Sequence, residues 1–233
     1  MARLPRLVIP DLPHHVVLRS INRQSVFLDS QDYEFFLDAL QEQLQGQAIK
    51  LHAYVLLDHK IHLLLTPQTD AVLSRLMQGL GRRYVRYFNQ RYQRFGTLWE
   101  GRFRAGPMQP SPYVLAVMTL LDWMPVRAGQ AQQPKDYAWS SHRHWSGFEH
   151  RKLLSPHPLY WELADTPFGR EAAYQALVGA GIGSTLTESI EHSAMGGWLL
   201  GSPHFVQDMS ERVERRVGPG KPGRPRKLAD SKA

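Results

Sequence analysis

The spacing of apolar residues predicts three strands in the first third of the chain. Residues 14–20 (HHVVLRS) are rich in apolar and β-branched side chains and predict a first strand. Residues 50–57 and 61–66 are two further apolar runs, separated by a short polar turn and followed by a proline. Continuous apolar runs of this length are typical of strands that are covered on both faces. These two segments are therefore expected to form a central hairpin.

Apolar positions three and four residues apart predict helices between and after these strands. The first predicted helix covers residues 29–44. The second covers residues 70–92 and is expected to break or bend near Gly79 and Gly81, because glycine is a poor residue for a helix interior. The third covers residues 112–124 and is expected to stop there, because a proline follows.

The order of these elements predicts an α+β fold. With residues 98–108 as a further extended segment, they pack most simply as a ferredoxin-like antiparallel sheet with helices on one face. We expect this domain to cover residues 1–130. Residues 131–212 are polar and turn-rich with weaker helical spacing, and they predict a small, mostly helical C-terminal extension. Residues 213–233 are rich in Pro, Gly and Lys and predict a flexible basic tail.

Composition narrows the compartment and the possible metal ligands. The chain has 233 residues, 42% of them hydrophobic, which is enough for a substantial core. No apolar run is long enough to cross a membrane, and prolines interrupt the N-terminal segment where a secretory signal needs an apolar stretch. We therefore expect a cytoplasmic, nucleoid-associated protein. The absence of cysteine excludes disulfides and thiolate zinc sites, so any metal must use His, carboxylate or amide ligands.

Basic residues are concentrated in two blocks of a chain whose formal net charge is +7. Residues 82–104 (RRYVRYFNQRYQRFGTLWEGRFR) contain seven arginines and one acidic residue, and residues 214–227 contain six basic residues and one acidic residue. Clustered positive charge interleaved with aromatic residues favours a nucleic-acid partner. The alternative is a solvated basic helix without a ligand, whose aromatic residues pack in the core.

The segment LLDHKIHLLL, residues 56–65, differs from a metal-binding strand at one position. Alternate side chains of a strand share a face, so Lys60 and His62 point together while His59 and Ile61 point the other way. A histidine at both positions would place two imidazoles on one face, ready to hold a divalent cation. Lys60 has no lone pair to donate while it is protonated. The strand therefore has the form of a metal site that lacks one ligand.

Four separated motifs together resemble a known family. They are AYVLLDHKIHLLLTP (residues 53–67), the arginine-rich segment of residues 82–104, WMPVRAG (residues 123–129) and DYAWSS (residues 136–141). In this order they resemble the REP-associated tyrosine transposases, relatives of the single-strand insertion-sequence transposases with a His-hydrophobic-His (HUH) metal motif. The resemblance implies a DNA-binding protein that recognises short palindromic repeats folded as hairpins with single-stranded flanks, and DNA transposition through a tyrosine nucleophile.

The resemblance also implies where the catalytic residues should lie, and this chain departs from the pattern there. The family's first metal-binding histidine falls on Lys60 and the second on His62. The tyrosine nucleophile falls on Leu120 and the amide ligand on Met124, with Tyr113 as a weak substitute nucleophile about two helical turns away. We therefore expect a catalytically impaired protein without a cofactor. The alternative is an active transposase that uses Mg²⁺ or Mn²⁺ and forms a phosphotyrosine link to DNA.

Binding of single-stranded or hairpin DNA is expected to persist without this chemistry, and no membrane partner is expected. Residues 223–227 (GRPRK) resemble the core of an AT-hook, which follows a narrow minor groove, with a flexible solubilising tail as the alternative. The resemblance also allows a homodimer. The candidate DNA-binding residues are Arg82, Arg83, Arg86, Arg91, Arg94, Trp99, Arg102, Arg104, Arg224, Arg226 and Lys227.

Overall fold

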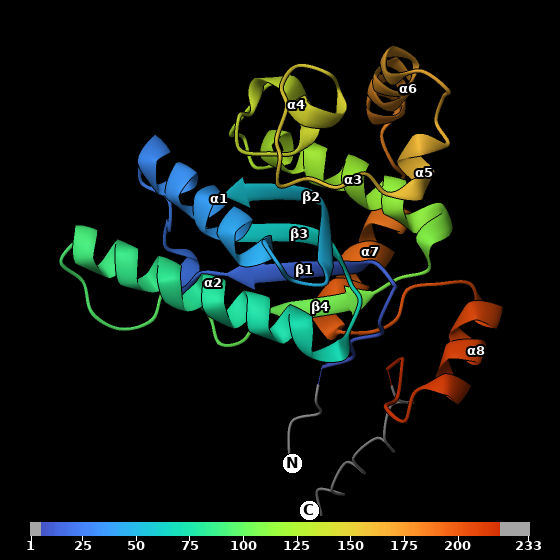
Figure 1. Ribbon diagram of the computed structural model, residues 1–233, viewed down its shortest axis with the longest axis horizontal. Coiled ribbons are helices and arrows are strands. Elements are labelled where there is room, and N and C mark those ends of the chain that lie inside the picture. The colour runs from blue at the N-terminus through green and yellow to red at the C-terminus, as the bar shows by residue number, and fades with distance from the viewer. Residues whose placement is uncertain (1–5, 220–233) are drawn as a thin grey trace, which may run out of the picture.

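A four-stranded antiparallel sheet in the order β2-β3-β1-β4 lies at the centre of the molecule (Figure 1). The computed structural model describes residues 6–219 of the chain. Its strands are β1 (His14–Arg19), β2 (Ile49–Leu57), β3 (Lys60–Pro67) and β4 (Arg104–Pro107). β2 and β3 form the predicted hairpin, and β1 pairs with both β3 and β4. This strand order, with a helix after β1 and another after β3, is ferredoxin-like, and the predicted fold class is confirmed.

Two helices cover one face of the sheet. α1 (Ser30–Leu44) begins after Asp29, whose side chain accepts a hydrogen bond from the amide of Asp32 and so caps the helix. α2 (Asp70–Arg91) follows β3, and the two helices lie side by side in front of the sheet (Figure 1). Most of their apolar side chains are buried, as the helical spacing of the sequence predicted, while Phe35 and Leu44 of α1 are partly buried against the core.

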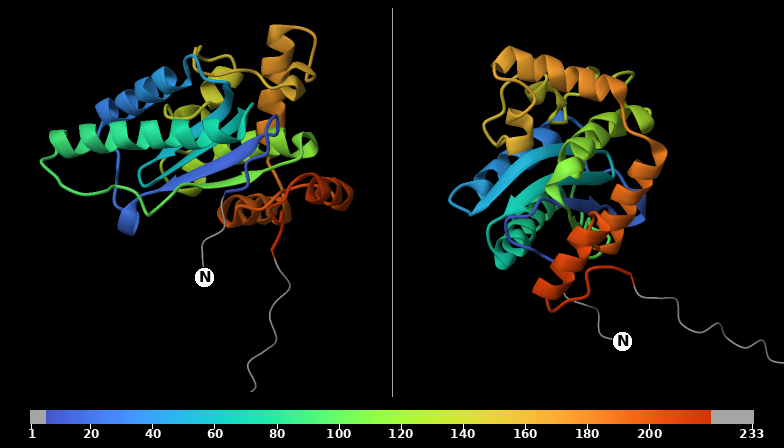
Figure 2. Two further views of the ribbon diagram at one scale, coloured as in Figure 1. Left: turned by 60° about the horizontal axis from the view of Figure 1, so that its bottom comes forward. Right: turned by 90° about the vertical axis from the view of Figure 1, so that its right-hand side faces the viewer.

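The other face of the sheet is covered by α3 (Pro110–Arg127) and α7 (Ser184–Gly196). α3 packs against β2 and β3, and α7 packs against β4 and β1. Figure 2 shows the resulting three layers, with the sheet between α1 and α2 on one side and α3 and α7 on the other. The sequence pattern placed all helices on one face, because the spacing of apolar residues in a helix does not reveal which side of a sheet it covers.

The C-terminal region packs closely on the sheet. Before α4 (His142–Trp145), an isolated bridge joins Ser140 to Val55 of β2, and the amide of Ser155 donates to the carbonyl oxygen of Leu51 at 2.7 Å. The remaining helices are α5 (Pro158–Trp161), α6 (Pro167–Ala180) and α8 (Pro203–Arg212), with short 3-10 turns η1 (Ile21–Arg23) and η2 (Pro134–Asp136) earlier in the chain. One hydrophobic cluster contains residues from Val16 to Ile190. The domain boundaries at residues 130 and 212 stay a prediction.

Two helices differ from the sequence prediction. α2 continues without a break through Gly79 and Gly81. A β-carbon at Gly79 would lie 2.3 Å from the side-chain oxygen of Gln43, so this glycine permits the close approach of α1. α3 passes through Pro125 and ends at Arg127, since a proline in the last turn removes only one backbone hydrogen bond. Among the described residues, no helix is both long and apolar enough to cross a membrane.

Candidate functional site

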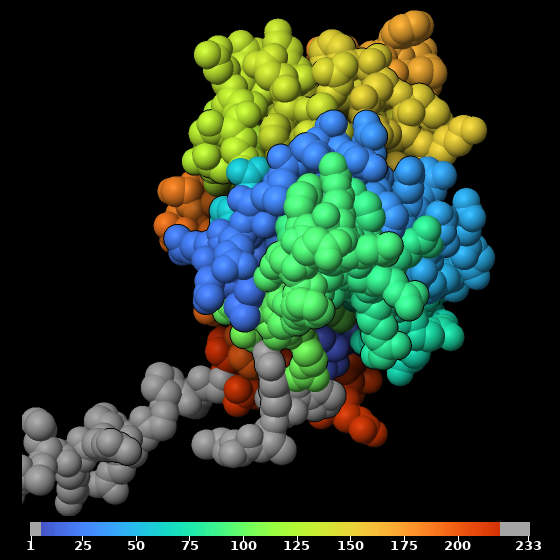
Figure 3. All heavy atoms as spheres, turned by 90° about the vertical axis from the view of Figure 1, so that its left-hand side faces the viewer, coloured from blue at the N-terminus to red at the C-terminus, as the bar shows by residue number. Residues whose placement is uncertain are grey.

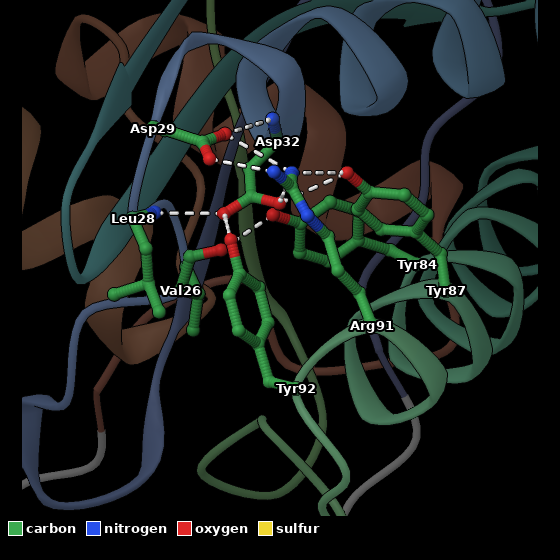
Figure 4. Close-up of polar contacts among 8 residues, drawn as sticks. All are labelled: Val26, Leu28, Asp29, Asp32, Tyr84, Tyr87, Arg91 and Tyr92. Carbon is green, nitrogen blue, oxygen red and sulfur yellow. Dashed lines mark hydrogen bonds and ion pairs between the residues drawn. The ribbon is translucent and has the colours of Figure 1, made fainter.

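A buried carboxylate fixes the end of the arginine-rich helix α2 to the start of α1. Asp32 is 0% exposed, and its side chain accepts hydrogen bonds from the amide of Leu28, from the hydroxyls of Tyr87 and Tyr92 and from the guanidinium of Arg91 (Figure 4). Burial, with Asp32 beside it, raises the pKa of Tyr92 to about 12. The hydroxyl therefore remains a donor at neutral pH. A buried carboxylate needs this number of donors, so the network has a structural role.

Arg91 was predicted to bind DNA, and the structure places it inside this network. Its guanidinium forms ion pairs with Asp29 at 2.6 Å and with Asp32 at 2.8 Å, and it donates to the hydroxyl of Tyr87. Two carboxylates therefore neutralise its charge. Figure 4 shows the guanidinium pointing back toward the start of α1.

An open cavity of about 650 Å³ lies on the same side of the sheet, between α2, residues 97–103 and β1. We call it the arginine cavity. None of the described residues that line it is acidic. Its apolar part includes Leu18, Val85 and Phe103. Its basic side chains come from the N-terminal segment, from α2 and from the loop before β4, and they are Arg6, Arg75, Arg82, Arg86 and Arg102.

Helical spacing explains how α2 supplies three of these side chains. Arg82 and Arg86 lie seven and eleven residues after Arg75, close to two and three turns of helix, so all three share one side of α2. None of the three forms an ion pair with another residue in the described part of the chain. Unpaired guanidiniums around an apolar floor can hold phosphates and leave room for a base or sugar.

The other predicted DNA-binding residues lie elsewhere or are engaged. Arg83 points to α1, where its guanidinium pairs with Glu42. The guanidinium of Arg94 lies 5.7 Å from the ring centre of Phe88. Trp99 lines the arginine cavity but is only 7% exposed, with its ring centre 6.0 Å from that of Tyr84. Arg102 lines the cavity, Arg104 pairs in register with Val17 on the opposite face of the sheet, and Arg224, Arg226 and Lys227 lie outside the described residues.

The predicted metal strand faces the opposite side of the sheet, toward α3 and α7. Lys60 and His62 share this face with His15 of β1, as the β1–β3 register requires. We call these three residues the histidine face. The ring nitrogens His15 Nε2 and His62 Nδ1 are 2.8 Å apart and share a hydrogen bond. The side chains are nearly inaccessible, at 1% exposed for His15 and 3% for His62.

Burial keeps both imidazoles neutral. It lowers the pKa of His15 to about 3, with Lys60 adding to the effect, and it lowers the pKa of His62 well below its usual range. Burial also lowers the pKa of Lys60, while Glu191 of α7 acts in the opposite direction. Two neutral imidazoles beside an ammonium give this face no negative charge with which to attract a cation.

The residues of the histidine face do not fit the divalent metal that the HUH motif implies. His15 and His62 direct one nitrogen each at the other, and their remaining ring nitrogens are buried without a hydrogen-bond partner in the described structure. Lys60 lies where the resemblance places the first histidine of the motif. Within the described ranges, no three His, Cys, Asp or Glu side chains are grouped so that they could hold a metal ion.

The position predicted for the nucleophile is part of the core. Leu120 of α3 is 0% exposed, and Met124, one turn later, is 6% exposed. Tyr113 is half-buried in the first turn of α3 and packs against the core. The structure therefore offers no side-chain hydroxyl at the family's nucleophile position.

Helix α7 packs against the sheet beside His15 of the histidine face. A β-carbon at Gly106 of β4 would lie 2.8 Å from both the carbonyl oxygen and the hydroxyl of Ser193 in α7. Gly106 pairs directly with His15, so the contact lies over the buried imidazoles. Without the glycine, helix and strand could not approach so closely.

Comparisons with known proteins bear on these two surfaces. Residues 9–118 match the family model described as "Transposase IS200 like". This range, a little under half of the chain, is similar to the IS200-like transposases. A solved REP-associated tyrosine transposase bound to a REP hairpin is similar over 67% of this chain and 99% of its own, with 15% identity and a TM-score of 0.54. At this identity the likeness shows the fold.

A solved transposase-like protein from Deinococcus radiodurans is also similar, over 55% of this chain and 98% of its own, with 17% identity and a TM-score of 0.37. No curated protein sequence matches. The matched range includes β1 to β4, α1 and α2, so both the arginine cavity and the histidine face lie largely in the part of the chain that matches the family model. α7, which closes the histidine face, lies outside that range.

Sequence reasoning missed three side chains of the arginine cavity and the histidine face. Arg75 lies outside the arginine-rich segment, although its helical spacing from Arg82 was a usable signal. Arg6 reaches the cavity from a segment without predicted structure, and its guanidinium lies 3.7 Å from the ring centre of Phe103. His15 stands two residues into the first strand, but its partner His62 could be found only once the β1–β3 register was known.

Proposed function

We propose that this protein, which is similar to the IS200-like transposases, binds hairpin or single-stranded DNA in the arginine cavity and does not cleave it. The observation that carries the proposal is the cavity itself, where Arg75, Arg82 and Arg86 form no ion pair in the described part of the chain and none of the described lining residues is acidic. Guanidiniums of this kind bind phosphate oxygens, and release of counterions then supplies most of the free energy of binding. The REP hairpin bound by the similar solved transposase supports hairpin DNA as the ligand class.

The absence of cleavage is proposed from the opposite face of the sheet. Strand cleavage through a phosphotyrosine requires a hydroxyl that can reach the scissile phosphate, with a positive charge beside it. Leu120 stands at the predicted nucleophile position, both histidines are buried, and α7 packs on Gly106, the direct strand neighbour of His15. Lys60 carries a positive charge but cannot replace the nucleophile. An active metal-dependent transposase is the alternative, and it would require Tyr113 or another hydroxyl to reach DNA.

The binding half is tested with a hairpin oligonucleotide that carries a single-stranded flank. Affinity is measured by fluorescence anisotropy between 50 and 200 mM salt for the wild type and for the double variant Arg82→Ala/Arg86→Ala. If both arginines contact phosphates, the slope of log Kd against log salt should fall by roughly 1.5, about 0.7 to 0.9 for each lost contact.

Arg83→Gln is the matched control, because it removes one positive charge of α2 outside the cavity, where Glu42 already pairs with it. Its slope should remain close to that of the wild type. Equal slopes for the wild type and the double variant would show that the cavity is not the phosphate site.

The cleavage half is tested on a denaturing gel. The wild type is incubated with the same hairpin and Mg²⁺ or Mn²⁺, and neither a shortened strand nor a covalent protein–DNA adduct should form. An adduct that is lost in Tyr113→Phe would establish the active transposase instead, with Tyr113 as nucleophile. The gel separates the two halves, since binding and cleavage are scored independently.

A further inference from the structure

An almost fully exposed phenylalanine stands at the end of the arginine-rich helix. Phe95 is 95% exposed, more than any other large apolar side chain in the described part of the chain. It belongs to the loop that follows α2. In Figure 3 the end of α2 and this loop, drawn in green, project toward the viewer. An aromatic ring in this setting retains all of its apolar surface for a partner.

Hydrogen bonds hold the loop that presents this ring. The amide of Arg94 donates to the carbonyl oxygen of Asn89 at 2.9 Å, and the side chain of Asn89 donates to the carbonyl oxygen of Gly96 at 2.8 Å. Gly96 has a φ of +86°, which a glycine adopts without strain. At the base of the loop, Tyr92 donates to the buried Asp32. These hydrogen bonds thus hold both ends of the loop that presents the ring of Phe95.

The surroundings of Phe95 select a polyanionic partner. The segment of residues 82–104 contains seven arginines and one acidic residue, Glu100, which pairs with Arg19 at 2.9 Å. The carboxylates of Asp29 and Asp32, at the start of α1, share the guanidinium of Arg91. Two residues after Phe95 the same loop becomes a wall of the arginine cavity, beginning at Thr97. The exposed ring is therefore attached directly to the wall of the basic cavity.

We propose that Phe95 is a stacking platform for an unpaired base of the DNA whose phosphates lie in the arginine cavity. The inference rests on the proposed DNA binding and adds a specificity to it, because only a strand with unpaired bases can use the ring. An aromatic side chain stacks on any base, whereas the bases of a blunt duplex are already stacked on one another. Phe95 thus favours hairpins with a single-stranded flank over blunt hairpins.

The test compares two DNA ligands and three variants. A hairpin with a short flank carrying 2-aminopurine and the same hairpin with a blunt end are titrated with the wild type, Phe95→Ala, Phe95→Trp and Phe168→Ala. Phe168, on α6, is the matched control because it is 83% exposed and lies far along the chain from the arginine-rich segment. Both phenylalanines are on the surface, so the folded state is expected to tolerate their removal.

Phe95→Ala should weaken binding of the flanked hairpin by roughly 5- to 100-fold, the range expected for loss of one stacked base, and should abolish the quenching of 2-aminopurine. Phe95→Trp should retain both, and Phe168→Ala should match the wild type. The blunt hairpin should bind all four proteins alike.

Failure of the proposed DNA binding and failure of the proposed stacking give different results. If the wild type binds neither hairpin, the proposed DNA binding is wrong and the inference falls with it. If the wild type binds the flanked hairpin and Phe95→Ala binds it equally well with unchanged quenching, the stacking platform is wrong while DNA binding stands.

Discussion

The arginine cavity and the histidine face lie on opposite sides of one sheet and differ in every physical property that bears on function. The cavity is open, apolar at its floor and basic, and none of the described residues that line it is acidic. The histidine face is covered by α7, and its two imidazoles are buried and neutral. Like charges that lie close together repel one another and lower the stability of the folded state. The arginines of the cavity, which repel one another in this way, lie on the side of the sheet where we propose that DNA binds.

The comparison also shows when a perturbed pKa does not indicate a reactive site. Strongly shifted values often mark catalytic residues. Here the pKa of His15 is lowered to about 3 chiefly because helix and strand exclude water from it. The side chain has no route to a substrate. Arg75, Arg82 and Arg86 carry the stronger functional signal, because they line an open cavity and form no ion pair in the described part of the chain.

Among the substitutions that test this comparison, Leu120→Ala should lower the free energy of unfolding the most. The side chain is fully buried, and removal of a buried leucine costs about 2–5 kcal/mol in transfer free energy and cavity formation. The free energy of unfolding, measured in urea, should fall by that amount, while the folded protein should bind hairpin DNA with unchanged affinity. A stable Leu120→Ala variant with weakened DNA binding would show that this position still takes part in function.

Adding a methyl group at Gly106 should move helix α7 away from the histidine face. In Gly106→Ala the new carbon would meet the backbone of Ser193 at 2.8 Å, so α7 must shift, at a cost of about 1–3 kcal/mol in unfolding free energy. Gly179→Ala in α6 is the control, because nothing lies within 4 Å of the added carbon. That variant should gain roughly 0.5–1 kcal/mol from the better helix propensity of alanine. Equal effects of the two substitutions would contradict the tight α7 contact.

The sequence predicted the sheet more reliably than the surfaces. The hairpin of β2 and β3 follows from two apolar runs around one polar turn, and α1 follows from helical spacing, because these signals are local. Pro125 was overvalued as a helix stop, since the packing of α3 on the sheet outweighs one missing hydrogen bond.

Whether an arginine forms an ion pair or lines the cavity could not be predicted from the sequence, because this depends on partners that are distant in sequence. Arg91 and Arg86 look equivalent in the arginine-rich segment, yet Arg91 is paired with Asp29, 62 residues earlier, and Arg86 lines the cavity. The closure of the histidine face depends likewise on α7, which lies about 120 residues after β3 in the chain. Local spacing carries no information about such contacts.

The effect that is smallest at pH 7 concerns His52 and appears only as the pH falls. The His52 ring accepts a hydrogen bond from Thr66 on the covered side of the sheet and donates to the carbonyl oxygen of Ser155. Burial lowers the pKa of His52 to about 4. Between pH 6.5 and about 4 the unfolded chain therefore binds a proton that the folded protein does not, and stability is lost as pH falls through this window. His52→Gln should flatten the dependence of unfolding free energy on pH by up to about 1.4 kcal/mol per pH unit. His204→Gln, at a side chain that is 88% exposed, is the control and should leave the slope unchanged. A His52→Gln slope equal to that of the wild type would mean that water reaches this side of the sheet after all, and that α3 and the C-terminal region cover it less tightly than the contacts of His52 indicate.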